Sequence, residues 1–86
     1  MINTFKNQNF APGTKVSLND EFGVVLNKIN ENNLFGLIRW DTKNENDIED
    51  WRGLFGSFLQ IGGKIIGQDH KFKFINDDGT IKDAGR

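Results

Sequence analysis

Few side chains in this sequence are suited to covalent or acid–base catalysis. The chain has one histidine, His70, two serines, Ser17 and Ser57, and neither cysteine nor tyrosine. A serine nucleophile needs a histidine held beside it, but His70 lies at the start of a predicted strand, where a solvated side chain is expected. Two-carboxylate chemistry needs a cleft between the acids, and so small a domain offers little room for one. We therefore predict that the protein is not an enzyme and has no catalytic residues.

The residues best suited to binding a partner lie between the only two tryptophans of the chain. Residues 41–50 contain five carboxylates and one lysine, a local charge of −4. An indole face beside carboxylates attracts the cationic head of lysine or arginine, and the cation–π part is worth about 0.5–2 kcal/mol. The pattern predicts a site for a basic protein partner, formed by Trp40, Asp41, Asp47, Glu49, Asp50 and Trp51. The competing interpretation places Trp40 in the core and uses the acids as a helix cap and a solvated loop.

The acidic run does not fit a calcium-binding loop. With Asp41 at the first position of an EF-hand loop, Lys43 occupies the third position and Asn46 replaces the glycine of the sixth. The lack of cysteine also removes thiolate sites for zinc. We therefore predict no metal ion and no cofactor.

Turn and strand signals predict one mainly β domain. Residues 1–11 show no hydrophobic period and are interpreted as an N-terminal arm, ahead of a single domain at 12–86. Pro12-Gly13 leads into a short strand at 15–18. Five to six short strands are expected, in a small antiparallel sheet or a half-closed barrel, because closure removes exposed edges.

The strongest element is a β-hairpin over residues 22–41, with a four-residue loop in its middle. In that register Val25 faces Ile38 and Gly23 faces Trp40 on one side of the pleat, which is predicted to be the core side.

The opposite side of this hairpin is half apolar. It carries Leu26, Phe35 and Leu37, so a second element or another subunit is expected to cover it. We predict that these three residues form an apolar interface.

Residues 48–59 fit either a strand or a short helix. The apolar residues that recur at a helical period are Trp51, Leu54, Phe55, Phe58 and Leu59. Asp47 would cap such a helix, with Glu49 and Asp50 in its first turn. Two glycines inside the segment oppose the helix by about 1 kcal/mol each.

Two further turns are predicted in the second half of the chain. Gly62-Gly63 reads as the turn of a hairpin over 58–66, and Asp78-Gly79 as a turn after a strand at 70–75.

That last strand alternates lysine with phenylalanine, which suggests a second recognition surface. Small barrels bind single-stranded nucleic acid through lysines on the phosphates and aromatic rings on the bases. The residues concerned are Lys64, Lys71, Phe72, Lys73 and Phe74. The same alternation also predicts core phenylalanines and solvated lysines, and a net charge of −1 provides no general attraction to nucleic acid.

Three short stretches carry a resemblance to a known fold. Pro-Gly-Thr-Lys-Val, then Phe-Gly-Val-Val-Leu, then Phe-Gly-Leu-Ile-Arg-Trp-Asp, all within residues 12–41, resemble SH3-like small barrels of the Tudor, KOW and Mib/Herc2 kind. The resemblance implies a barrel-like fold and a noncatalytic recognition role, and it identifies no ligand.

Composition suggests the cellular compartment and the kind of source of the protein. No apolar run approaches the roughly 20 residues of a membrane helix, and the first residues lack the features of a signal peptide. Without cysteine, a reducing cytoplasm is the expected compartment. Asparagine, isoleucine and lysine make up a third of the chain, which suggests a bacterium, a phage or a mobile element.

The sequence as a whole predicts a noncatalytic protein-interaction module. It either self-associates as a homo-oligomer or docks on a protein partner through an apolar face with an acidic rim. One alternative is a small-barrel binder of single-stranded nucleic acid that uses residues 70–75. The other is a small-ligand or enzyme site formed between subunits.

Overall fold

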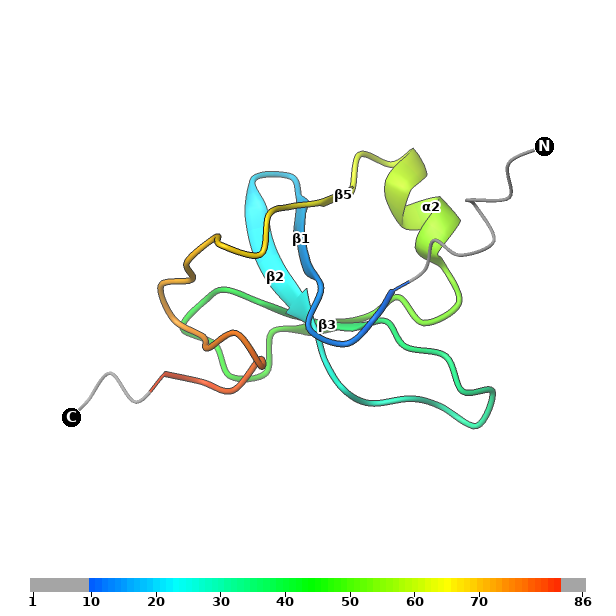
Figure 1. The fold of residues 1–86 in the computed structure, drawn as a ribbon, viewed down its shortest axis with the longest axis horizontal. Coiled ribbons are helices and arrows are strands. Elements are labelled where there is room, and N and C mark those ends of the chain that lie inside the picture. Colours follow the sequence, from blue (N-terminus) through cyan, green and yellow to red (C-terminus); the bar gives the residue numbers. More distant parts are fainter. Residues whose placement is uncertain (1–9, 83–86) are drawn as a thin grey trace.

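Short antiparallel strands dominate the computed structural model, which describes residues 10–82 (Figure 1). Within that range the elements in chain order are β1 (Lys15–Leu18), β2 (Glu21–Val25), β3 (Leu37–Trp40), β4 (Ile48–Asp50), α2 (Phe55–Gln60) and β5 (Lys64–Ile65). The fold is therefore mainly β with one short helix, as predicted.

All five strands belong to one sheet, in the order β4-β3-β2-β1-β5. Strands β4 and β5 are its two edges and do not pair with each other among the described residues. The prediction named a small antiparallel sheet or a half-closed barrel, and the described residues form one antiparallel sheet that is not closed into a barrel.

The predicted register of the central hairpin is confirmed. Gly23 pairs with Trp40 and Val25 pairs with Ile38, and the side chains of Trp40, Val25 and Ile38 are buried. A Cβ atom on Gly23 would lie 2.6 Å from the carbonyl oxygen of Arg39 and 2.8 Å from the indole ring of Trp40. Glycine is thus required here because the neighbouring strand and the indole leave no room for a side chain.

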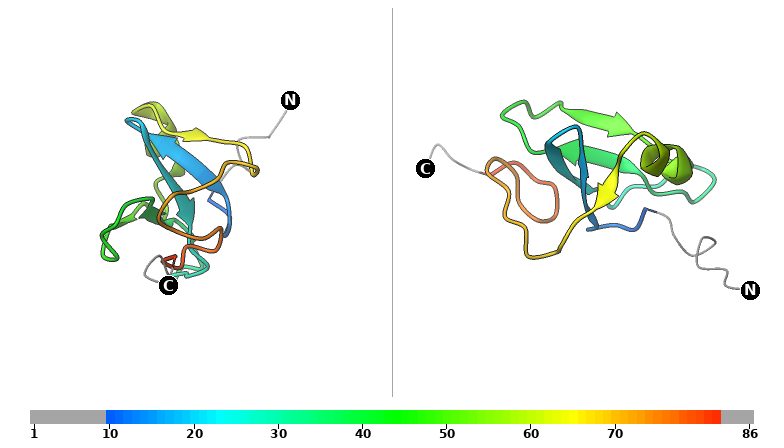
Figure 2. Two further views of the ribbon diagram at one scale, coloured as in Figure 1. Left: turned by 90° about the vertical axis from the view of Figure 1, so that its left-hand side faces the viewer. Right: turned by 90° about the horizontal axis from the view of Figure 1, so that it is seen from above.

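The two faces of the sheet bury separate apolar clusters, because side chains alternate along each strand. The first cluster lies on the α2 side and contains Phe10, Val16, Leu18, Val25, Ile38, Trp40, Phe55 and Phe58. The second contains Val24, Phe72 and Ile75. Figures 1 and 2 show α2 and residues 67–82 at opposite ends of the molecule. We call residues 67–82 the C-terminal segment, and it covers the second face of the hairpin that the sequence left open.

The packed core begins earlier in the chain than the predicted domain boundary. Residue 10 belongs to the predicted N-terminal arm, yet the Phe10 ring is buried and lies edge-on to Phe55 and Phe58, with ring centroids 5.0 and 5.4 Å away. Residues 1–9 of the predicted arm lie outside the described residues.

The short helix starts later than its predicted cap. Residues 48–50 form β4, and α2 begins at Phe55 with Leu54 in the N-cap position and no acidic residue in its first turn. The prediction that Asp47 caps a helix whose first turn holds Glu49 and Asp50 is therefore wrong. These residues lie in or beside an edge strand instead.

Gly62-Gly63 ends the helix and does not form a hairpin. The amide of Gly63 donates to the carbonyl of Phe58 (2.8 Å), the amide of Gly62 donates to Leu59 (3.1 Å), and Gly62 has φ +108°. This pair of bonds defines a Schellman cap, in which glycine supplies the positive φ. The strand that follows, β5, pairs with β1.

The alternation of lysine and phenylalanine at 70–75 does not produce a strand. Several backbone groups of the C-terminal segment bind charged side chains, and its β pairing is limited to one isolated bridge. The Asp41 carboxylate accepts from the amides of Lys73 (2.8 Å) and Phe74 (2.7 Å), and the Lys82 ammonium donates to the carbonyl of Phe72 (2.6 Å). The predicted turn at Asp78-Gly79 is present, because Ile75 forms a bridge with Ile81 across it.

Candidate protein-interaction surface

The two tryptophans and one acid of the predicted site meet at a single carboxylate oxygen. The indole N–H groups of Trp40 and Trp51 both donate to Oε1 of Glu49, at 2.9 and 3.1 Å. Trp40 pairs within the sheet and is 2% exposed, so it belongs to the core and is unavailable to a partner. Trp51 is half-buried and lies edge-on to Phe58, with centroids 5.2 Å apart. Only Trp51 of the pair therefore presents an indole surface.

Two of the predicted partner-binding acids instead hold the fold together. Asp41 binds the two backbone amides of the C-terminal segment described above. Asp47 accepts a hydrogen bond from the hydroxyl of Thr42 (2.8 Å) within the β3–β4 loop. An Arg39 guanidinium N–H also donates to the Glu45 carbonyl of that loop. Asp47 thus closes the β3–β4 loop and Asp41 anchors the C-terminal segment. The competing interpretation is right that Trp40 belongs to the core, but no acid caps the helix.

Asp50 is oriented by a neighbouring arginine on the surface. The Arg52 guanidinium donates to both carboxylate oxygens of Asp50, at 2.9 and 2.8 Å, and the Arg52 amide donates to Oδ1 at 3.1 Å. These hydrogen bonds lower the pKa of Asp50 to about 2, and the same carboxylate raises the pKa of Arg52. Asp50 is therefore ionised at neutral pH and is fixed in direction, although an exposed pair of this kind adds little to stability.

A shallow depression of about 260 Å³ lies where β4 gives way to α2. It is lined by Glu49, Asp50, Trp51 and Leu54. Leu54 directly precedes α2 and Ile61 directly follows it, and their side chains are 47% and 57% exposed. We call these five residues the β4–α2 surface. It combines an indole and two aliphatic side chains with two carboxylates.

The apolar interface predicted on the hairpin is largely covered by the chain itself. Leu26 is buried, and its side chain lies close to Gly79 of the C-terminal segment. Phe35 is half-buried against the first apolar cluster, and Leu37 is half-buried in β3. Within the described part of the chain, the exposed large apolar side chains lie elsewhere: Phe22, Ile29, Ile48, Leu54, Leu59, Ile61, Ile65 and Ile81.

Sequence reasoning missed the surface role of Leu54 because the helical period assigned it to the buried face. The structure buries Phe55 and Phe58 and leaves Leu54 and Leu59 exposed. A helix of six residues buries only one side of two turns, so the flanking members of the apolar pattern remain outside. The shortness of the helix, signalled by Gly62-Gly63, was the available indication.

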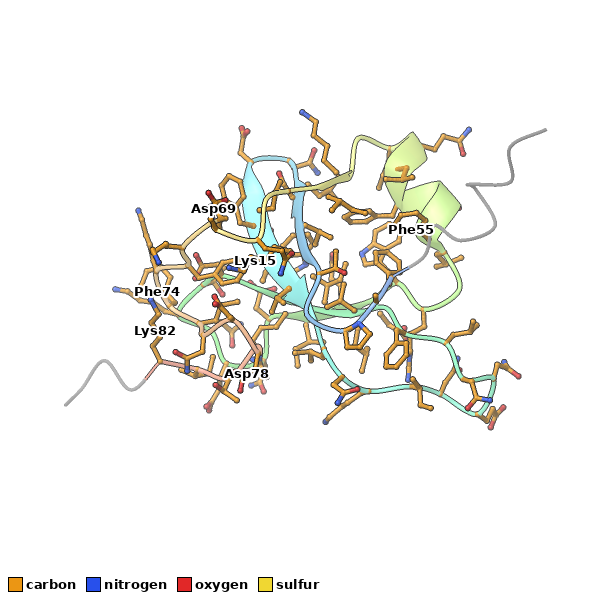
Figure 3. The ribbon with its side chains drawn as sticks, in the orientation of Figure 1. Lys15, Phe55, Asp69, Phe74, Asp78 and Lys82 are labelled. Atoms are coloured by element: carbon orange, nitrogen blue, oxygen red, sulfur yellow. The ribbon has the colours of Figure 1, made fainter. Side chains whose placement is uncertain are left out.

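The residues of the nucleic-acid alternative are divided between core and surface. Phe72 is buried, with the Lys15 ammonium 5.2 Å from its ring centroid, so a base cannot stack on it. Lys64, Lys71 and Lys73 are exposed, and Phe74 is half-buried. Figure 3 shows Phe74 and Lys82 together near the C-terminal end, far from Phe55 on α2.

A second recess, of about 320 Å³, lies beside Phe74. Its lining residues are Asp20, Glu21, Phe22, Asp41, His70, Lys71, Lys73 and Phe74. The ring of Phe22 stacks on His70 at 4.6 Å with an interplanar angle of 27°. Aromatic rings and two lysines therefore share one recess, but Phe22 and His70 take the place of the predicted Phe72.

Residues 10–82 contain no cluster of three or more histidine, aspartate or glutamate side chains arranged to hold a metal ion. Over the same part of the chain, no helix has the length and apolar character needed to cross a bilayer.

Comparison of the chain with protein-family models, characterised proteins and solved structures finds no significant match. The resemblance of residues 12–41 to SH3-like small barrels therefore stays a prediction.

Proposed function

We propose that the protein is a noncatalytic interaction module that docks on a protein partner through the β4–α2 surface. The observation that carries the proposal is the depression lined by Trp51 and Leu54 between the carboxylates of Glu49 and Asp50. The partner segment that fits it carries basic side chains next to apolar ones. The SH3-like resemblance of residues 12–41 implies the same kind of role.

Charge and apolar area act together on this surface. Residues 41–52 contain five carboxylates and two cationic side chains, so the region around β4 has a net charge of −3. A lysine or arginine head over the Trp51 indole gains about 0.5–2 kcal/mol from cation–π attraction. Apolar atoms of the partner that cover Leu54 and Ile61 add about 25 cal/mol per Å² removed from water.

A basic partner fits this surface better than a second copy of the chain. A symmetric homodimer places the same patch on both sides of its interface. Self-association through the β4–α2 surface would therefore bring Glu49 and Asp50 against their equivalents, and like charges at an interface oppose binding. Light scattering over a range of protein concentrations measures whether the protein self-associates. We expect no dimer formed through the β4–α2 surface.

Peptide selection tests the proposed docking. Panning a displayed library of random 12-residue peptides on the protein is expected to enrich sequences with lysine or arginine beside apolar residues. The double variant Glu49→Gln/Asp50→Asn should bind a selected peptide about tenfold more weakly, because each lost charge contributes up to about 1 kcal/mol. Glutamine keeps the side-chain oxygen that accepts the two indole N–H bonds, so the fold is preserved.

The matched control for this experiment removes two charges elsewhere. Glu21→Gln/Glu31→Gln changes the net charge equally, at two exposed positions outside the β4–α2 surface. This control should bind the peptide like the wild type. Selected peptides without basic residues, or equal loss of affinity in both double variants, would contradict the proposal.

A second candidate function rests on the recess beside Phe74. Its aromatic rings offer stacking surfaces and Lys71 and Lys73 offer phosphate contacts, the combination found in binders of single-stranded nucleic acid. Fluorescence anisotropy of a labelled twelve-nucleotide thymidine strand at low salt measures this function. Under this candidate Lys71→Gln/Lys73→Gln weakens binding and reduces its salt dependence, whereas Lys64→Gln, on β5, does not. A failure of the wild type to bind the strand at low salt would exclude it.

A further inference from the structure

Strand β4 is an edge strand without a covering element among residues 10–82. It stands at one end of the strand order, and its three residues, Ile48, Glu49 and Asp50, are all exposed. Edge strands are commonly blunted by proline, a bulge or a covering loop, because their free backbone groups invite another strand. Strand β4 has no proline, and its own defence is its negative charge.

The hydrogen bonds of β4 show which backbone groups face outward. Trp40 donates its amide to the carbonyl of Asp47, and Trp51 donates its amide to the carbonyl of Gly36. Residues 47, 49 and 51 therefore direct their backbone groups to β3. Because these directions alternate along an antiparallel strand, Ile48 and Asp50 direct theirs away from the sheet.

Among residues 10–82, three of the four outward backbone groups of Ile48 and Asp50 have no hydrogen-bond partner. The amide of Ile48 donates to the carbonyl of Asn46 (2.9 Å) in the preceding turn. The remaining groups are the carbonyl of Ile48 and both the amide and the carbonyl of Asp50. An amide and a carbonyl on one residue form the pair that an antiparallel strand exchanges with its neighbour.

The opposite edge of the sheet, strand β5, has fewer outward backbone groups than β4. Strand β5 has two residues, and Lys64 faces Ser17 while the Ile66 amide donates to the carbonyl of Lys15. Because the backbone groups of Lys64 and Ile66 are directed toward β1, only Ile65 of β5 directs its backbone groups outward. Strand β4 is therefore the better template for an added strand.

We propose that the partner segment binds as an extended strand that pairs with the free edge of β4. This inference rests on the proposed function and specifies how the partner is held. Backbone hydrogen bonds to Ile48 and Asp50 supply the pairing, and alternate side chains of the added strand supply specificity.

The charges around β4 determine which strand fits. Glu49 pairs with Ile38 in the sheet, so its side chain is on the α2 side together with Trp51. A basic side chain on that side of the added strand lies beside the Glu49 carboxylate and near the Trp51 indole, since neighbouring strands place facing side chains about 5 Å apart. An acidic strand, including β4 of a second copy, meets repulsion at the same positions. The occupant is thus an extended segment with lysine or arginine at alternate positions.

Nuclear magnetic resonance with a defined peptide tests this inference. The probe is a synthetic eight-residue peptide that alternates lysine with valine, added at millimolar concentration to the isotopically labelled protein. We expect the Asp50 amide resonance to shift and its exchange with water to slow by at least tenfold. The Glu49 amide, already bonded to β3, should change its exchange little.

Two methylated peptides provide the matched control. N-methylation of every valine and N-methylation of every lysine each block one edge of the peptide strand, because alternate amides point to opposite edges. One of the two methylated peptides should not bind, and the other should bind with an affinity within a few fold of that of the parent peptide. Equal binding of the methylated and parent peptides would overturn strand addition while leaving side-chain docking intact. A parent peptide that does not bind would overturn both this inference and the proposed function.

Discussion

Replacing Phe58 with alanine is expected to lower the free energy of unfolding of this domain by about 3–5 kcal/mol. The Phe58 side chain is fully buried on α2, edge-on to Phe10 on one side and to Trp51 on the other. The substitution leaves a cavity where three rings meet and also removes their favourable edge-to-face contacts. Because small domains are stable by only about 5–15 kcal/mol, the loss shifts the urea unfolding midpoint strongly, as followed by tryptophan fluorescence.

The neighbouring leucine is the control for this substitution. Leu59→Ala removes a large apolar side chain from the same helix, but that side chain is exposed. We expect it to cost less than about 1 kcal/mol. If the two variants were equally stable, α2 would not be anchored through Phe58 and the described core would be incorrect.

The central hairpin illustrates what the sequence alone could predict. The two-residue period fixes which side of each strand is apolar, and a slip of one residue would turn Val25 and Ile38 to the wrong face. The register was therefore predictable. The lengths of the strands were not, because the ladder ends at Val25 and the next eleven residues, 26–36, follow an irregular path closed by the side chain of Asn30, which accepts from two amides.

The β1–β2 turn could have been predicted more fully. Asn19 and Asp20 connect the paired residues Leu18 and Glu21, and both have positive φ, +52° and +66°. Positive φ at both central residues defines a type I′ turn, for which asparagine and aspartate are favoured. The local sequence contained this information, in contrast to the glycine pair at 62–63, which fits a hairpin turn and a helix cap equally well.

The candidate site could be predicted only as a group of residues. The sequence placed Trp40, Glu49 and Trp51 in one region, and the structure brings all three together at one oxygen atom. The separate roles of the acids depend on partners far along the chain, as with Asp41, which binds amides more than 30 residues away. No local pattern contains such a contact. The same limit applies to residues 70–75, where the local pattern predicted a strand but the side chains of Lys15, Asp41 and Lys82 satisfy several of the backbone groups.

Replacing Lys15 with methionine is expected to lower the free energy of unfolding by about 2–4 kcal/mol. The Lys15 side chain is 2% exposed, and its ammonium donates to the carbonyls of Gln68 (2.7 Å) and His70 (2.6 Å) and pairs with the carboxylate of Asp77 (3.0 Å). Figure 3 shows Lys15 directed from β1 toward the C-terminal segment. Methionine has a similar shape but donates no hydrogen bond, so two carbonyls lose their partner at about 1–3 kcal/mol each, partly offset by the apolar contact that methionine gains.

A matched lysine substitution distinguishes the specific role of Lys15 from a general effect of removing a lysine. Lys64→Met, at an exposed position on β5, should change stability by no more than about 0.5 kcal/mol. In Lys15→Met the amides of Phe74 and Asn76 should exchange with water faster than those of the β2–β3 ladder, because the ammonium holds the C-terminal segment to β1 and not the strands to each other. Equal stability of the two variants would mean that water replaces the ammonium without cost. Uniform acceleration of exchange would mean that the segment and the sheet unfold as one unit. The expected pattern makes Lys15, together with Asp41, a group that holds the C-terminal segment to the sheet, which gives a buried charge in so small a core a structural purpose.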